Sequence, residues 1–173
     1  MIRKALPSDA RAIAQVHINS WQHAYRDLMP AHYLDSLDAT LAHRESNWRR
    51  ALELGESSVW VAQLHEQVVG WICVGASRDE DCVGGNVGEV EALYVAAGHW
   101  HTGVGQALWN AGVRALKAQG FERLTLWVLS GNERARRFYR RVGCIEEIGS
   151  QRPLERGGVK LGEVRYGLSL PAL

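Results

Sequence analysis

The chain has 173 residues, 46% of them apolar, which is enough to bury one hydrophobic core and short for two full domains. Its 20 lysines and arginines nearly balance 19 acidic residues, so no overall field draws the protein to nucleic acid or to a membrane surface. We therefore expect a single domain over residues 1–173, in which any anion-binding site is local.

The cysteines and the first residues favour a cytoplasmic protein. Cys73, Cys82 and Cys144 are few, odd in number and unevenly spaced, which suits neither a disulfide framework nor a zinc site. The N-terminal segment has no apolar run of signal-peptide length, and no stretch approaches the ~20 apolar residues of a membrane span. We expect a soluble protein that carries no metal.

The N-terminal third is predicted to hold a strand followed by helices. A short strand over residues 2–5 ends before Pro7, and Ser8 or Asp9 is placed to cap a helix with one apolar face. Pro30 introduces a second helical region over about 31–54, in one or two pieces, which Gly55 ends.

The middle of the chain changes to the pattern of strands. Residues 58–64 and 68–77 are short runs rich in Val, Trp and Ile around a turn-like segment, which indicates a β-hairpin. A polar loop over 78–86 leads to a third run of this kind at 87–95. Antiparallel pairing of the three runs is the simplest arrangement.

Helices and strands alternate in the remainder. We expect a helix over 103–119, a strand over 123–129, a helix from Asn132 to Gly143, and two last strands near 144–152 and 159–170. This order indicates an α/β (α+β) fold in which a mixed, mostly antiparallel sheet of about seven strands is flanked by about four helices.

The most informative segment is residues 93–108, where a strand passes through a glycine-bearing loop directly into a helix. Such a loop lets main-chain N–H groups at the positive end of a helix approach a phosphate or diphosphate. A dinucleotide-binding fingerprint would need a third glycine where Leu108 stands, and a P-loop would need Lys directly after Gly103, where Val104 stands. The segment is therefore neither a dinucleotide-binding fingerprint nor a P-loop.

The same segment resembles the coenzyme A loop of the GNAT superfamily of N-acetyltransferases, whose motif is Gln or Arg, two residues, Gly, one residue, then Gly or Ala. Here the motif spans Trp100 to Gly105, and Trp100 replaces the usual Gln or Arg. The strand at 126–129, followed by Asn132, Phe138, Tyr139 and Gly143, resembles the superfamily's next strand and helix. The resemblance covers about residues 59–144.

This resemblance implies a GNAT-like sheet that is splayed at the cofactor strands, and transfer of an acetyl group from acetyl-CoA to a small-molecule or peptide amine. A homodimer follows from family analogy alone. The positions that the resemblance implies for the cofactor are Leu93, Tyr94, Val95, Trp100, His101, Thr102, Gly103, Val104, Gly105, Gln106 and Asn132. Those it implies around the acceptor are Trp21, His23, Tyr25 and Tyr33. The helix after Asn132 also has a basic side that fits either the cofactor's phosphates, with Arg136 as the predicted contact, or an ordinary solvated face; it consists of Arg134, Arg136, Arg137, Arg140 and Arg141.

The catalytic prediction starts from the acceptor amine, which must lose a proton before it attacks. An amine with a pKa near 10.4 is mostly protonated at pH 7, so deprotonation costs about 4 to 5 kcal/mol. Glu89 stands where some relatives carry a general base, and Glu91 lies two residues on, on the same strand face. By resemblance, Tyr139 protonates the leaving sulfur.

Other interpretations remain open at this point. Either glutamate fits an ordinary solvated strand position, Tyr139 fits a core tyrosine, and Asn132 fits a simple helix cap. A coenzyme A-binding sensor or an inactive member of the fold is the main alternative to an enzyme. A structural module that buries its tryptophans against a partner is a third.

Overall fold

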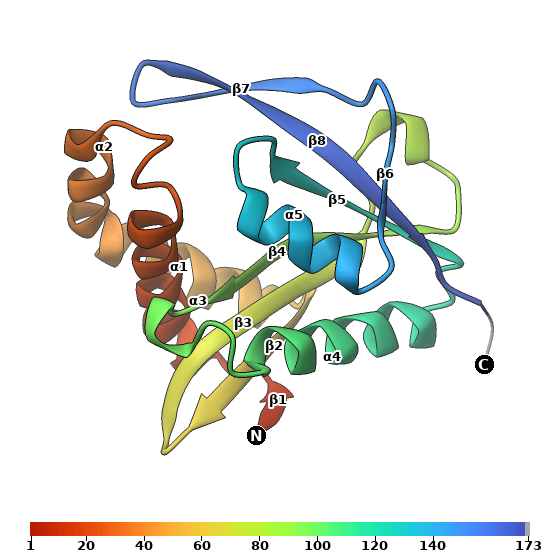
Figure 1. Ribbon diagram of the computed structural model, residues 1–173. Coiled ribbons are helices and arrows are strands. Elements are labelled where there is room, and N and C mark those ends of the chain that lie inside the picture. The colour runs from red at the N-terminus through yellow and green to blue at the C-terminus, as the bar shows by residue number, and fades with distance from the viewer. Residues whose placement is uncertain (172–173) are drawn as a thin grey trace.

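One open sheet with helices on both faces accounts for the fold, which the computed structural model describes for residues 1–171 (Figure 1). The strands are β1 (Ile2–Lys4), β2 (Ser58–Leu64), β3 (Gln67–Ala76), β4 (Val87–Val95), β5 (Arg123–Leu129), β6 (Ile145–Glu146), β7 (Arg152–Arg156) and β8 (Val159–Ser169). The α-helices are α1 (Ala10–Ala24), α2 (Ala31–Ser36), α3 (Leu41–Leu54), α4 (Val104–Ala118) and α5 (Glu133–Arg141).

The strand order is β1-β2-β3-β4-β5-β8-β6, and β7 pairs with β8. The pairs are antiparallel, except that β4 and β5 run parallel. The predicted mixed, mostly antiparallel sheet is therefore confirmed, and so is the hairpin of β2 and β3. The parallel pair requires a crossover, which α4 provides.

The parallel pair opens into a fork, as the resemblance implied. The ladder joins residues 87–89 of β4 to residues 123–125 of β5. Beyond it the two strands diverge in Figure 1, because β5 continues along β8 as far as Leu129. The register of β3 against β4 also shifts between Cys73 and Val74, which makes Glu91 the extra residue of a β-bulge.

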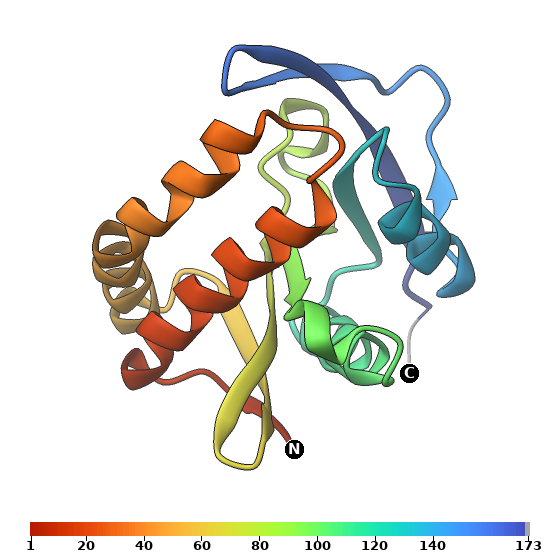
Figure 2. The ribbon, with the colours of Figure 1, turned by 60° about the vertical axis from the view of Figure 1, so that its left-hand side comes forward.

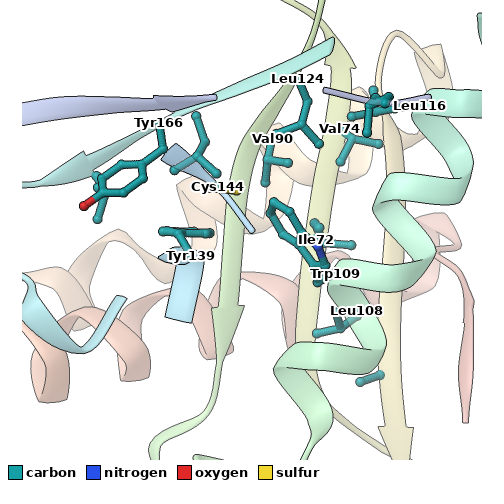
Figure 3. Close-up of a cluster of buried hydrophobic side chains, with 14 of the residues drawn as sticks. Ile72, Val74, Val90, Leu108, Trp109, Leu116, Leu124, Tyr139, Cys144 and Tyr166 are labelled. Carbon is teal, nitrogen blue, oxygen red and sulfur yellow. The ribbon is translucent and has the colours of Figure 1, made fainter. Parts of the chain in front are cut away.

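The two faces of the sheet carry separate cores. Ile72 and Val74 of β3 pack beneath α4, as Figure 3 shows, whereas Trp71 and Cys73 face the other way, toward α1 and α3. Figure 2 places α1 and α4 on opposite sides of the sheet. The contact with α4 is close because Gly112 faces β3, where a Cβ atom would lie 2.6 Å from Ile72.

Two local predictions are wrong. The strand expected over 144–152 is interrupted by a turn in which Gly149 has φ of 80° and the Ser150 N–H donates to Glu147, so the sheet has eight strands within residues 1–171. Neither Ser8 nor Asp9 caps α1 through its side chain. Asp9 instead accepts hydrogen bonds from Arg3 and from the Leu6 N–H.

The second helical region consists of α2 and α3, joined by a 3-10 turn (Leu37–Thr40), and Gly55 ends it in the left-handed conformation with φ of 65°. Over residues 1–171, no helix combines the length and apolar composition needed to cross a bilayer.

Candidate active site

A pocket of about 430 Å³ follows the fork between β4 and β5. At one end it is lined by the start of α4 and by α5. At the other end it reaches α1, the side chains of Glu89 and Glu91, and the β7–β8 hairpin. A single cavity therefore joins the glycine loop to the predicted catalytic carboxylates.

The start of α4 leaves main-chain donors open toward this pocket. The N-cap residue is Gly103, with φ of 89°, which has no side chain to cap the helix. The first helical bond runs from Ala107 N–H to the Gly103 carbonyl, so the N–H groups of residues 104–106 precede the bonded turns. His101, Gly103, Gly105 and Gln106 line the pocket, as expected for an anion cradle.

Three arginines of α5 add positive charge at the same end. Arg134, Arg137 and Arg141 line the pocket, and among residues 1–171 none of them has a carboxylate within ion-pair distance. Arg136, the arginine expected at the cofactor, lies outside the lining. It binds Ser130, Glu146 and Tyr166 on the other side of the helix.

Trp100, which replaces the Gln or Arg of the motif, contacts both sides of the fork: the end of β4 on one side and α5, which follows β5, on the other. Its indole Nε1 donates to the Val95 carbonyl at 2.7 Å, and the Arg134 guanidinium lies 3.7 Å above its ring. Ser20 Oγ donates to the same carbonyl at 2.9 Å. The Val95 carbonyl oxygen thus already accepts two hydrogen bonds.

Asn132 and Tyr139 line the same pocket. Asn132 Oδ1 accepts from Ala135 N–H at 3.2 Å, so its role as the cap of α5 is confirmed. Tyr139 is 8% exposed, and burial raises the pKa of its phenol above the usual value of about 10. The hydroxyl is therefore protonated across the neutral range.

Glu89 is a buried carboxylate held by one arginine. Its side chain is 4% exposed, and Arg78 binds it through Nη2 at 2.7 Å, Nε at 3.0 Å and its main-chain N–H at 3.0 Å. Glu91 lies on the same face, where it accepts from Ser57 at 2.7 Å and lies 3.7 Å from Arg78. Both glutamates line the pocket, and Arg78 bridges them.

Next to the pocket end that holds Glu89 and Glu91 lies an ionic network that sequence reasoning missed. Trp127 Nε1 donates to Asp79, and the Arg152 guanidinium lies 4.1 Å above the Trp127 ring. Arg152 also binds Glu163 at 2.6 Å, and Arg165 binds Asp79 at 3.1 Å. The network depends on the pairing of β5, β7 and β8, which no local sequence signal reveals.

The remaining predicted positions divide between the pocket and its surroundings. Trp21, Tyr25, Leu93, Tyr94 and Val95 line it. His23 is exposed beside Asn19, and Tyr33 packs against Gly157, where it ties α2 to the β7–β8 turn. Thr102 donates to the His99 carbonyl, and Val104 packs toward the core under α4. These last four side chains lie outside the pocket lining.

The forked sheet is the fold of GNAT-type acyltransferases, and comparison with known proteins gives the family. The model of the acetyltransferase (GNAT) family matches residues 18–144. The chain therefore belongs to the GNAT family, and the prediction of an acetyl-CoA-dependent acetyltransferase is confirmed.

Individual relatives agree with this assignment. The uncharacterized N-acetyltransferase YuaI of Bacillus subtilis (strain 168) is 33% identical over 168 residues, which cover 96% of this chain and 91% of the relative. The PaiA N-acetyltransferase of Thermoplasma acidophilum, solved with coenzyme A, is 17% identical with a TM-score of 0.75 and covers 98% of both chains. The ribosomal-protein-alanine N-acetyltransferase of Brucella melitensis, 20% identical with a TM-score of 0.77, covers 98% of this chain and 99% of that one.

Proposed function

We propose that the protein transfers the acetyl group of acetyl-CoA to a primary amine of a small molecule or peptide by direct attack on the thioester. The nitrogen forms a bond to the carbonyl carbon, the carbon–sulfur bond breaks, and one proton passes from the nitrogen to solvent while the sulfur gains one. The observation that carries the proposal is one continuous pocket with anion donors at one end and carboxylates at the other, which Tyr139 also lines.

The start of α4 holds the diphosphate in this proposal. The N–H groups of Val104, Gly105 and Gln106 are donors at the positive end of a helix, which favours a phosphate oxygen. Strand β4 would carry the arm of the donor along the fork. Because the Val95 carbonyl is occupied by Ser20 and Trp100, we assign the arm's main-chain pairing to the region of Leu93.

Glu89 is the proposed general base. It lies buried at the acceptor end, so a carboxylate there takes a proton directly or through a water. Since Arg78 occupies both of its oxygens, the base becomes free only if the guanidinium moves. Arg78 has room for this, because its side chain is 63% exposed.

Tyr139 is the proposed proton donor to the leaving sulfur. Its phenol is protonated at physiological pH, and burial raises its pKa still further above that range. A thiol with a pKa near 8.5 is already a fair leaving group, so this contribution is smaller than that of the base.

A second candidate, a coenzyme A-binding protein without turnover, is favoured by the same ion pair of Arg78 and Glu89, which blocks the base as it stands. The test incubates the purified protein with acetyl-CoA and a panel of small amines, amino acids and peptides, and follows free thiol and the acetylated product by mass spectrometry. Thiol release that requires one amine supports the enzyme. Coenzyme A binding without release for any member selects the second candidate. A cytoplasmic location and a homodimer stay predictions.

A further inference from the structure

Arg134 is a half-buried cation that has no anionic partner within the described residues. No hydrogen bond or ion pair links its guanidinium to any other group among residues 1–171, although Arg3, Arg136 and Arg165, which are also half-buried, each bind carboxylates. Burial lowers the pKa of Arg134, as expected for a cation that has lost water without gaining an anion. Such a group is suited to bind an anionic ligand.

The position of Arg134 is fixed by Trp100. The guanidinium stacks on the indole ring at 3.7 Å, and the ring is held in turn by its Nε1 hydrogen bond to Val95. The only polar atom of the indole is thus turned toward β4 and cannot contact a phosphate. The cation that stands over the glycine loop comes instead from α5, on the opposite arm of the fork.

We propose that Arg134 binds the diphosphate of the acetyl donor in place of the side chain that the loop motif has lost at residue 100, and that Trp100 is its positioning residue. This inference rests on the acetyl-CoA site proposed above. Arginine presents paired N–H donors that match two phosphate oxygens, and Arg134 shares the pocket with the open N–H groups of α4. The diphosphate would then be held from both arms of the fork.

The test measures binding of three ligands by calorimetry: coenzyme A, 3′-dephospho-coenzyme A, which keeps the diphosphate, and pantetheine, which lacks it. We expect Arg134→Ala to weaken coenzyme A and dephospho-coenzyme A by about tenfold or more, because charge-assisted hydrogen bonds are lost. Pantetheine binding should change by less than about twofold. The matched control is Arg140→Ala, an exposed arginine of the same helix outside the pocket, which should bind all three ligands as the wild type does.

Variants of Trp100 test the positioning role. Trp100→Ala should lower the affinity for coenzyme A as much as Arg134→Ala does, and the double variant should bind it no more weakly than either single variant. Trp100→Phe, which keeps an aromatic ring for the guanidinium to stack on, should retain most of the affinity. Unchanged melting temperatures separate these effects from misfolding.

Three results for Arg134→Ala would overturn the inference. They are an unchanged affinity for coenzyme A, an equal loss of affinity for pantetheine, and an unchanged affinity for dephospho-coenzyme A. All readouts are of binding. A wild type that binds coenzyme A but acetylates nothing contradicts the proposed function alone.

Discussion

The two ends of the pocket differ in whether their charged side chains are paired. At the α4 end, Arg134, Arg137 and Arg141 have no carboxylate partner among residues 1–171, and the first N–H groups of the helix are open. At the acceptor end, by contrast, Glu89 is bound by Arg78, and Glu163 by Arg152. One end has spare positive charge, and the other is internally neutralised.

This difference indicates that the two substrates meet the site in different ways. In the proposed site, the phosphates of acetyl-CoA meet N–H groups that are already in position, so binding of acetyl-CoA needs little rearrangement. A cationic amine meets carboxylates that already have partners, and it must displace an arginine to reach one. For the proposed site we therefore expect acceptor selectivity to depend on how readily Arg78 and Arg152 move, and affinity for acetyl-CoA to depend on fixed geometry.

The largest expected effect lies at the acceptor end. Glu89→Gln should lower kcat by roughly 100-fold or more, as removal of a general base typically does, while coenzyme A binding stays unchanged. The matched control is Glu91→Gln, because Glu91 lies on the same face and also beside Arg78. We expect this variant to lower kcat by less than about fivefold. Steady-state kinetics with the best amine of the panel decide the comparison. A larger loss in Glu91→Gln would assign the base to Glu91 instead.

Tyr139→Phe should lower kcat by roughly 10- to 30-fold with little change in KM, because the phenol acts on the leaving sulfur and not on binding. Burial raises the pKa of this phenol, so the wild type should show no loss of activity from Tyr139 ionisation up to about pH 10. Wild-type kinetics in Tyr139→Phe would place this residue in the core only.

The glycine loop should respond to backbone strain and not to side-chain volume. Gly103 has φ of 89° and open space around it, so Gly103→Ala strains the main chain and should weaken coenzyme A binding about tenfold. The control is Gly105→Ala, whose Cβ would meet Phe138 at an ordinary 3.6 Å and should be nearly neutral. Equal effects of the two substitutions in calorimetry would contradict this explanation.

The last prediction concerns stability at low pH and not catalysis or binding. His17 stacks on Tyr94 with ring centroids 4.7 Å apart, and burial lowers its pKa from 6.5 to about 3. The unfolded chain therefore binds a proton below pH 6.5 that the folded chain does not, and stability falls as pH falls through this window. Between about pH 7.5 and pH 5 the loss should be roughly 2 kcal/mol.

Denaturant unfolding of the wild type and of His17→Gln at both pH values tests this prediction. The variant should lose the His17 contribution and show a shallower dependence on pH. Parallel slopes would mean that other groups cause the acid sensitivity.

Local periodicity was sufficient for most of the fold and for part of the site. The runs at β4 and β5 and the cap at Asn132 depend on neighbours within a few residues, so the sequence predicts them well. Arg136, the arginine predicted at the cofactor, lies outside the pocket lining, whereas Arg134 lies within it. Arg134 lies four residues before Phe138, so the helical period predicts that the two side chains share a face.

The acceptor end could not be predicted, because it depends on register between distant strands. Asp79 and Arg165 are 86 residues apart and meet only through the folding of the sheet. The bulge at Glu91 has no residue signature either. The turn that divides the expected strand does have one, because Gly149 and Ser150 are turn-type residues.

Calorimetry of the wild-type protein with acetyl-CoA tests the central claim most directly, because every role assigned above depends on a diphosphate at the start of α4. We expect saturable one-to-one binding that weakens as salt concentration rises, since the contacts are ionic. A flat titration, from protein whose thermal unfolding shows that it is folded, would contradict the account.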